Sequence, residues 1–150
     1  KIIKAIRGKV KIVGVFQEAD VNCVNDLASN LGLDFVQLHG SEDNKYIEAI
    51  TVPVIKSITP DDHPAKIQAD YFILDRTQRG TGEMVDFKKA ARLAVGYKIF
   101  YAGGLDPDNV TDVIRKVQPF AVDVAGGVET NGYQDIKKIR LFIKNSKESI

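Results

Sequence analysis

The sequence predicts an α/β fold built on a parallel sheet of six strands. Short runs rich in Val, Ile and Phe alternate along the chain with stretches whose apolar residues have helical spacing. The short runs are apolar at nearly every position, which is typical of strands buried on both faces. Strict alternation of strand and helix favours parallel strands joined by right-handed crossovers.

The elements are expected in the following order. The strands are the six runs 11–16, 34–39, 52–58, 70–75, 98–102 and 121–124. Asp20 is expected to cap a helix that ends at Gly32, and Asp86 a helix over 87–95 that ends at Gly96. A third helix starts at Pro107 and runs to Val117, and a fourth follows the apolar spacing of 136–143. Residues 1–8 have the pattern of the second half of a helix.

Composition narrows the functional classes. The 150 residues are 44% hydrophobic, and 21 basic against 20 acidic residues give a net charge of +1. No overall field therefore favours nucleic acid or a membrane surface as a partner. One Cys excludes an internal disulfide and suits a reducing compartment, and no apolar run is long enough to cross a bilayer. We expect a cytoplasmic protein.

Two glycine pairs are the most informative motifs. Gly103 and Gly104 follow one apolar run, Gly126 and Gly127 follow the next, and each pair leads into a helical pattern. Backbone N–H groups at the entrance to a helix bind anions, and the last two loops of a (β/α)8 barrel commonly hold one phosphate in this way. A single glycine is more often a turn residue with positive φ, so the argument rests on the two pairs together.

The number of units leaves two architectures open. Six βα units are fewer than the eight of a (β/α)8 barrel, which usually needs at least about 200 residues. The pattern fits the last three quarters of such a barrel, beginning inside its second helix, or an open doubly wound sheet of six strands. No linker or low-complexity segment divides the chain, so residues 1–150 are expected to form a single domain.

An ordered set of motifs favours the barrel. The set comprises Val13-Gly14-Val15-Phe16, Val36-Gln37-Leu38-His39-Gly40-Ser41-Glu42, Ile73-Leu74-Asp75, Gly80-Thr81-Gly82, Ala102-Gly103-Gly104-Leu105-Asp106-Pro107-Asp108-Asn109-Val110, Val122-Asp123-Val124 and Gly127-Val128-Glu129. In order and spacing it resembles the phosphoribosylanthranilate isomerase family of tryptophan biosynthesis, over essentially all 150 residues. The resemblance implies strands three to eight of a (β/α)8 TIM barrel, without the first two βα units.

The resemblance also implies a reaction. The family converts N-(5-phosphoribosyl)anthranilate into 1-(2-carboxyphenylamino)-1-deoxyribulose 5-phosphate, an Amadori rearrangement that needs no metal or organic cofactor. Asp75 matches the general acid. The family's base is a Cys in a Lys-(Ile/Val)-Cys-Gly motif at the end of the first strand, a motif that these residues do not contain. Cys23 lies in a helical pattern and is interpreted as structural, so these 150 residues alone are expected to turn over very weakly.

Further site residues follow from the same resemblance. Phosphate contacts are implied for Gly103, Gly104, Gly126 and Gly127, and loop closure over the substrate for Gly80 and Gly82. Asp123 is implied near the ribose and amine of the substrate, and His39 as a residue that orients the site. The alternatives are a buried structural aspartate for Asp123 and a structural histidine for His39.

Two other classes of function remain open. A barrel that has lost catalysis would bind phosphate without turnover. A structural or interaction fragment would use its unpaired strand edges, which invite dimerisation. No His, Cys or carboxylate set has the spacing of metal ligands, so no metal is expected.

Overall fold

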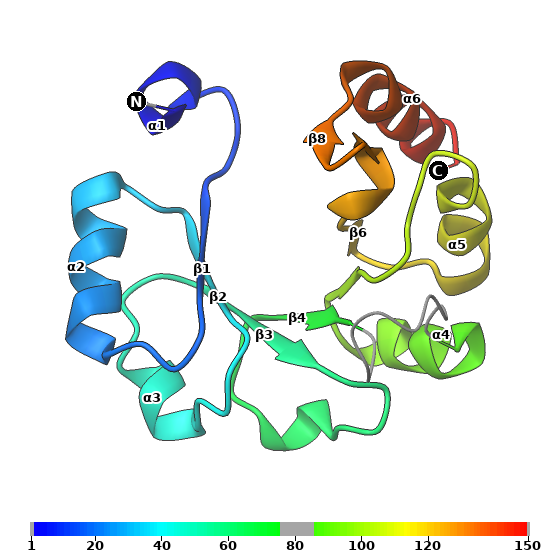
Figure 1. Cartoon of the computed structure of the whole chain (residues 1–150). Coiled ribbons are helices and arrows are strands. Elements are labelled where there is room, and N and C mark those ends of the chain that lie inside the picture. The colour runs from blue at the N-terminus through cyan, green and yellow to red at the C-terminus, as the bar shows by residue number, and fades with distance from the viewer. Residues whose placement is uncertain (1, 76–85, 150) are drawn as a thin grey trace. The chain divides into compact units, whose positions relative to one another are not determined.

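The fold is an α/β arrangement with a parallel sheet, as the sequence predicts. A computed structural model describes residues 2–75 and 86–149 (Figure 1). Six strands follow one another in the sheet in chain order: β1 (Val13–Phe16), β2 (Phe35–Leu38), β3 (Val54–Ile58), β4 (Tyr71–Leu74), β5 (Ile99–Tyr101) and β6 (Ala121–Val122). The helices are α1 (Ile2–Ile6), α2 (Val21–Leu31), α3 (Asn44–Glu48), α4 (Phe87–Gly96), α5 (Val110–Val117) and α6 (Ile136–Lys147), with the short 3-10 helices η1 (Pro64–Lys66) and η2 (Gly126–Val128).

The chain forms two compact units. The first unit comprises Lys1–Ser57 and His63–Phe72, and the second comprises Ile58–Asp62 and Ile73–Ile150. In the part of the chain that is described, no helix is both long and apolar enough to span a membrane.

The core of the first unit lies between its helices and one face of its strands. Val24 and Ala28 of α2 and Ile47 of α3 pack against Val36, Leu38 and Val54. The strands are parallel, with Val36 opposite Val54 and Leu38 opposite Lys56. Successive side chains of a strand point to opposite faces, so the helices cover the face that carries residues 36 and 38.

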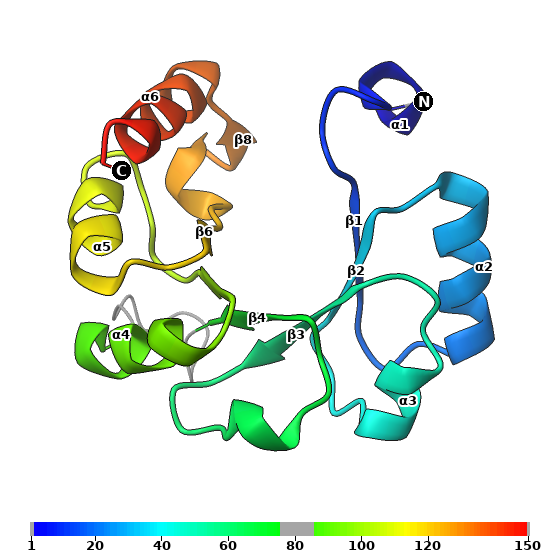
Figure 2. The same cartoon turned by 180° about the vertical axis from the view of Figure 1, so that it is seen from behind.

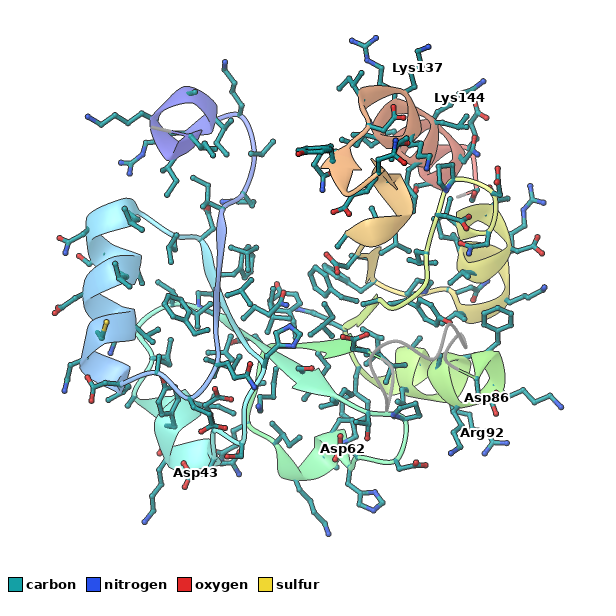
Figure 3. The ribbon with its side chains drawn as sticks, viewed as in Figure 1. Asp43, Asp62, Asp86, Arg92, Lys137 and Lys144 are labelled. Carbon is teal, nitrogen blue, oxygen red and sulfur yellow. The ribbon has the colours of Figure 1, made fainter. Side chains whose placement is uncertain are left out.

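In the second unit, α5 packs against both α4 and α6 (Figure 2). Its three buried valines, Val110, Val113 and Val117, lie on one face of the helix. Ile99 and Tyr101 of β5 are fully buried. The last helix, α6, buries Phe142 and exposes Lys137 and Lys144 (Figure 3).

Side-chain caps fix most helix starts where the sequence predicts them. The Asp20 carboxylate accepts hydrogen bonds from the N–H groups of Asn22 and Cys23, and Gly32 ends α2 with φ 62°. Asp86 caps α4 in the same way (Figure 3). Gly96 is the last residue of α4 rather than its cap, because the chain continues from it into an extended Tyr97.

Other boundaries differ from the prediction: β1 and β3 each begin two residues later than expected, β2, β4 and β5 are one residue shorter at both ends, and α6 extends to Lys147. Helix α5 begins at Val110 and not at Pro107. Residues 107–109 form a turn before it, in which the Asp106 carboxylate accepts from the N–H groups of Asp108 and Asn109 as a helix cap does. Strand β6 ends at Val122, two residues early, and the chain soon enters η2.

The sequence analysis also missed a small antiparallel hairpin of β7 (Glu129–Thr130) and β8 (Tyr133–Gln134). Its turn, Asn131-Gly132, has φ of 53° and 78°. Asn-Gly favours this turn because both residues tolerate positive φ.

Candidate functional site

Three of the predicted site positions in the second unit, one catalytic and two substrate-binding, lie at one edge of its strands. The Ala102 N–H donates to the Leu74 carbonyl (3.0 Å), and the Asp123 N–H donates to the Tyr101 carbonyl (2.9 Å). The ends of β4, β5 and β6 are therefore neighbours. Asp75, the first glycine pair and Asp123 follow these three ends directly. This carboxyl edge is where barrel enzymes carry their sites.

The two glycine loops of the second unit are in direct contact. A Cβ atom built on Gly127 would overlap the Leu105 carbonyl oxygen and would lie 3.0 Å from Asp106 Cα, so the backbones leave no room for a side chain. Gly126, by contrast, has open space at this position. Gly103 and Gly104 both have φ 80°, a conformation that glycine adopts without the cost other residues incur.

Side chains hold the loop after β5 in shape. Asp106 and Asn109 bond each other reciprocally, since the Asn109 Oδ1 accepts from the Asp106 N–H (3.0 Å) and the Asp106 carboxylate accepts from the Asn109 N–H (2.9 Å). The Asn109 amide also donates to the Gly104 carbonyl (2.8 Å). These bonds fix the backbone of the loop that carries Gly103 and Gly104.

The two acidic candidates differ in exposure. Asp75 is half-buried, and its N–H donates to the Ile58 carbonyl (3.2 Å). Asp123 is exposed, so the alternative of a buried structural aspartate is wrong. Gly80 and Gly82 lie in residues 76–85, outside the described residues.

His39 belongs to the first unit and follows β2. Its N–H donates to the Phe16 carbonyl at the end of β1 (3.0 Å), and its ring Nε2 is hydrogen-bonded to the side-chain amide of Gln37. The imidazole is half-buried at the carboxyl end of its strand.

A charged network beside His39 was not predicted. The Lys56 Nζ lies 2.9 Å from Glu42 Oε2, and the two side chains are 7% and 2% exposed. Glu42 also accepts from the N–H groups of Glu18 and Gly40, each at 3.0 Å. Glu18 in turn accepts from the N–H and hydroxyl of Ser41. We call Glu18, Glu42 and Lys56 the carboxyl-end network.

Electrostatics within this network favour the charged form of Glu42. Burial raises the pKa of the Glu42 carboxyl, but the hydrogen bond from Lys56 and the backbone N–H donors outweigh burial, so the pKa lies below its ordinary value. The signal that could have revealed the network was Lys56 itself, since a lysine within an apolar strand is almost never buried without a partner.

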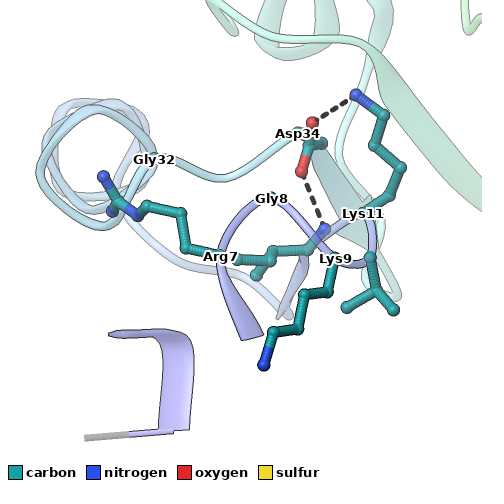
Figure 4. Close-up of a pocket in the computed structure, with 8 residues that line it drawn as sticks. Arg7, Gly8, Lys9, Lys11, Gly32 and Asp34 are labelled. Atoms are coloured by element: carbon teal, nitrogen blue, oxygen red, sulfur yellow. Dashed lines mark hydrogen bonds and ion pairs between the residues drawn. The ribbon is translucent and has the colours of Figure 1, made fainter. Parts of the chain in front are cut away.

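A second charged cluster lies at the opposite ends of the same strands (Figure 4). There Lys11 pairs with Asp34 (2.7 Å), Asp34 also accepts from the Ile12 N–H (2.8 Å), and Arg7 donates to the Leu31 carbonyl at the end of α2 (2.7 Å). These residues, the amino-end cluster, line a shallow depression. Most of its cationic groups are occupied by these contacts, which indicates a structural role.

Cys23 is exposed and lies in α2, within the helical segment that the sequence predicts. Among the residues that the structure describes, no three His, Cys, Asp or Glu side chains come together as metal ligands would.

The chain is similar to known proteins over nearly its whole length. It is 38% identical to an N-(5'-phosphoribosyl)anthranilate isomerase of Geobacter sp. strain M21, covering 99% of this chain and 78% of that protein. The corresponding enzyme of Streptococcus mutans is 37% identical with the same coverage.

Solved structures agree. The phosphoribosyl anthranilate isomerase of Thermus thermophilus superposes with a TM-score of 0.84 at 31% identity, covering 97% of this chain and 76% of that one. Another isomerase structure, solved in complex with reduced 1-(o-carboxyphenylamino)-1-deoxyribulose 5-phosphate, gives 0.81 at 30% identity, covering 98% and 76%.

A family-wide comparison gives the same result. Residues 1–145 match the family described as N-(5'phosphoribosyl)anthranilate (PRA) isomerase. This match, the identities above 30% and the glycine loops at the carboxyl ends of β5 and β6 agree. The chain belongs to the N-(5'-phosphoribosyl)anthranilate isomerase family.

Proposed function

We propose that this chain carries the acid and the phosphate-binding loops for the Amadori rearrangement of N-(5-phosphoribosyl)anthranilate to 1-(2-carboxyphenylamino)-1-deoxyribulose 5-phosphate. Family membership identifies it as an isomerase of tryptophan biosynthesis. The single observation that carries the proposal for its residues is the contact of the two glycine loops next to Asp75 and Asp123.

The proposed architecture is a (β/α)8 barrel, of which these residues supply strands three to eight within one domain. The chain-order sheet and the TM-score of 0.84 with the Thermus thermophilus enzyme support this assignment. In such barrels the catalytic groups lie at the carboxyl ends of the strands, where Asp75, Asp123 and both glycine pairs occur.

Asp75 acts as the general acid in the first step. It donates its proton to the furanose oxygen, the ring C–O bond breaks, and the anthranilate nitrogen becomes an iminium. A base then removes the proton from C2, and the C2–H electrons neutralise the iminium to give an enolamine, which becomes the ketone. Cys23 does not serve as this base, because it lies exposed on α2 and not at a strand end.

The glycine loops bind the phosphate through backbone N–H groups. Gly103 and Gly104 contribute from the loop after β5, and Gly126 and Gly127 from the loop after β6. Asp123, which is exposed at the same edge, contacts the ribose and amine of the substrate. His39 orients the substrate by hydrogen bonding, and Gly80 and Gly82 belong to the loop that closes over it.

The remaining proposals concern the partners of the protein, its compartment and its oligomeric state. The near-balanced charge supports a small-molecule substrate, without nucleic acid or membrane as partner, and the single Cys supports a location in the cytoplasm. A homodimer is proposed as well, and its support is a Thermotoga maritima relative described as dimeric.

The loss of substrate fluorescence on rearrangement tests the proposal. The purified chain is assayed with phosphoribosylanthranilate alone and after mixing with a separately made N-terminal barrel fragment that carries the family's Cys motif. We expect turnover on mixing and very little without the fragment. Asp75→Asn should then lower kcat about 10²–10⁴-fold. Asp26→Asn, an exposed carboxyl on α2, is the matched control and should not change it.

The opposite results are equally informative. Phosphate binding without turnover in either sample would identify a phosphate-binding protein that has lost catalysis. Full activity of Asp75→Asn would remove Asp75 from the role of acid.

A further inference from the structure

The two faces of the sheet in the first unit carry different side chains. Val36 and Leu38 face the helices, and the register places Val54 and Lys56 on that same face. Gln37 lies between residues 36 and 38 and therefore faces the opposite side. The His39 ring is bonded to Gln37, so the imidazole belongs to the face that the helices do not cover.

The peptides on both sides of His39 are fixed. The His39 N–H donates to the Phe16 carbonyl (3.0 Å). The next N–H, that of Gly40, donates to Glu42 Oε2 (3.0 Å), and the Gly40 carbonyl accepts from the Lys56 Nζ (2.5 Å). Both polar groups of Gly40 are thus bound by the two members of one buried ion pair.

The charged side chains of Glu18, Glu42 and Lys56 meet around Gly40. Glu18 and Glu42 approach so closely that a Cβ atom on Gly40 would lie 2.7 Å from Glu42 Oε1 and 2.8 Å from Glu18 Cδ. Two carboxylates that both lie against Gly40 repel each other, and Lys56, paired with Glu42, supplies one compensating positive charge. Glu18 itself has φ 50°, unusual for a non-glycine residue, in the conformation that directs its N–H to Glu42.

We infer that Glu42 and Lys56 are positioning residues for His39. From the helix-covered face they fix the Gly40 peptide, and this sets the direction in which the imidazole projects on the other face. A buried ion pair that only stabilised the fold would not need to bind both polar groups of the residue that follows the imidazole. The inference rests on the proposed function, in which His39 contacts the substrate.

The test compares three variants with the unmodified protein. Glu42→Gln removes one charge of the pair. Gly40→Ala keeps every charge but displaces the two carboxylates. Asp34→Asn is the matched control, because Asp34 also joins a lysine to a backbone N–H, but at the amino ends of the strands. The first readout is the ¹⁵N spectrum of the His39 ring. The second is kcat and KM for phosphoribosylanthranilate, measured in the presence of the N-terminal fragment.

We expect new His39 ring shifts in Glu42→Gln and Gly40→Ala, and none in Asp34→Asn. Misplacement of a substrate-orienting group by about 1 Å can cost about 100-fold in rate, so kcat should fall 10-fold to 100-fold while KM changes less than about twofold. When His39→Ala is already present, Glu42→Gln should lower kcat no further, because both substitutions remove the same function, the orientation of the substrate by the imidazole.

Several results would overturn the inference. One is a folded Glu42→Gln protein whose His39 ring shifts are unchanged. Another is a double variant in which Glu42→Gln lowers kcat further than His39→Ala alone does. If both variants fail to fold, hydrogen exchange in the unmodified protein decides: a Gly40 amide that exchanges as fast as in an unfolded chain contradicts the inference, and a protected one supports it. Absence of turnover in the unmodified protein refutes the proposed function alone, since the ring shifts still decide the role of Glu42.

Discussion

The loops at the carboxyl ends of the strands are held differently in the two units. In the first unit, the loops after β1 and β2 are joined by the side chains of Glu18, Glu42 and Lys56. In the second unit, the loops after β5 and β6 meet backbone to backbone at Gly127. A side-chain network depends on charge and hence on pH, whereas a backbone contact depends on the absence of a Cβ atom. The two loop pairs should therefore fail under different perturbations.

The largest effect is expected from Lys56→Met. It leaves the buried Glu42 carboxylate without its cation, a change that costs about 3–5 kcal/mol of unfolding free energy. Urea unfolding followed by circular dichroism measures this loss. Lys11→Met removes the exposed lysine of the amino-end cluster and should change stability little, because water screens that pair. If both variants lost the same unfolding free energy, the buried ion pair would be no more important for stability than the exposed one.

Gly127→Ala should be the next most severe change. Its methyl group collides with the Leu105 backbone, which must move, at a cost of about 1–3 kcal/mol. The neighbouring Gly126→Ala meets open space and should unfold at the urea concentration of the unmodified protein. The same midpoint for both variants would show that the loops do not touch.

Gly104→Ala tests the left-handed backbone of the loop after β5. At φ 80° a residue with a Cβ atom is disfavoured by about 1–2 kcal/mol. Thermal unfolding should detect this loss. Isothermal titration with inorganic phosphate should detect weaker binding, if the loop binds anions. An unchanged unfolding temperature would contradict the left-handed conformation.

The smallest effect is expected from acid, which should lower the stability of the first unit. The pKa of Glu42 is lower in the folded protein than its ordinary value of 4.5, because the Lys56 hydrogen bond and backbone donors outweigh burial. Its contribution is therefore complete above that ordinary value and is lost as pH falls through the lower, folded pKa. Urea midpoints between pH 6 and pH 3 measure the decline. In Glu42→Gln the urea midpoint should decline less steeply with falling pH. An identical slope would show that Glu42 does not contribute to the loss of stability in acid.

The sequence predicted the fold well where local chemistry decides. Asp20 and Gly32 bound α2 as predicted, since a cap needs only its own neighbours. The start of α5 was placed three residues too early, although Asp106 and Asn109 bond each other in the reciprocal manner of a capping box. The candidate residues Asp75 and Asp123 were implied by the family resemblance, and only the glycine pairs were also indicated by their place between a strand and a helix.

What the sequence did not predict depends on long-range pairing. Glu42 and Lys56 are 14 residues apart and come together only through the register of β2 and β3. Likewise, nothing local distinguishes Gly126 from Gly127, although only the second one abuts the Leu105 backbone. Such roles depend on which distant atoms arrive beside a residue, and spacing along the chain does not carry that information.

Cys23 has a practical consequence. It is the only cysteine of the 150 residues, it is exposed, and it lies within the first unit. A thiol-reactive fluorophore would therefore attach at a single known position, without substitution of any other residue. Its signal would follow the melting of α2, while far-UV circular dichroism averages over every helix. Comparing the two curves would reveal whether both units unfold in one cooperative transition or in succession.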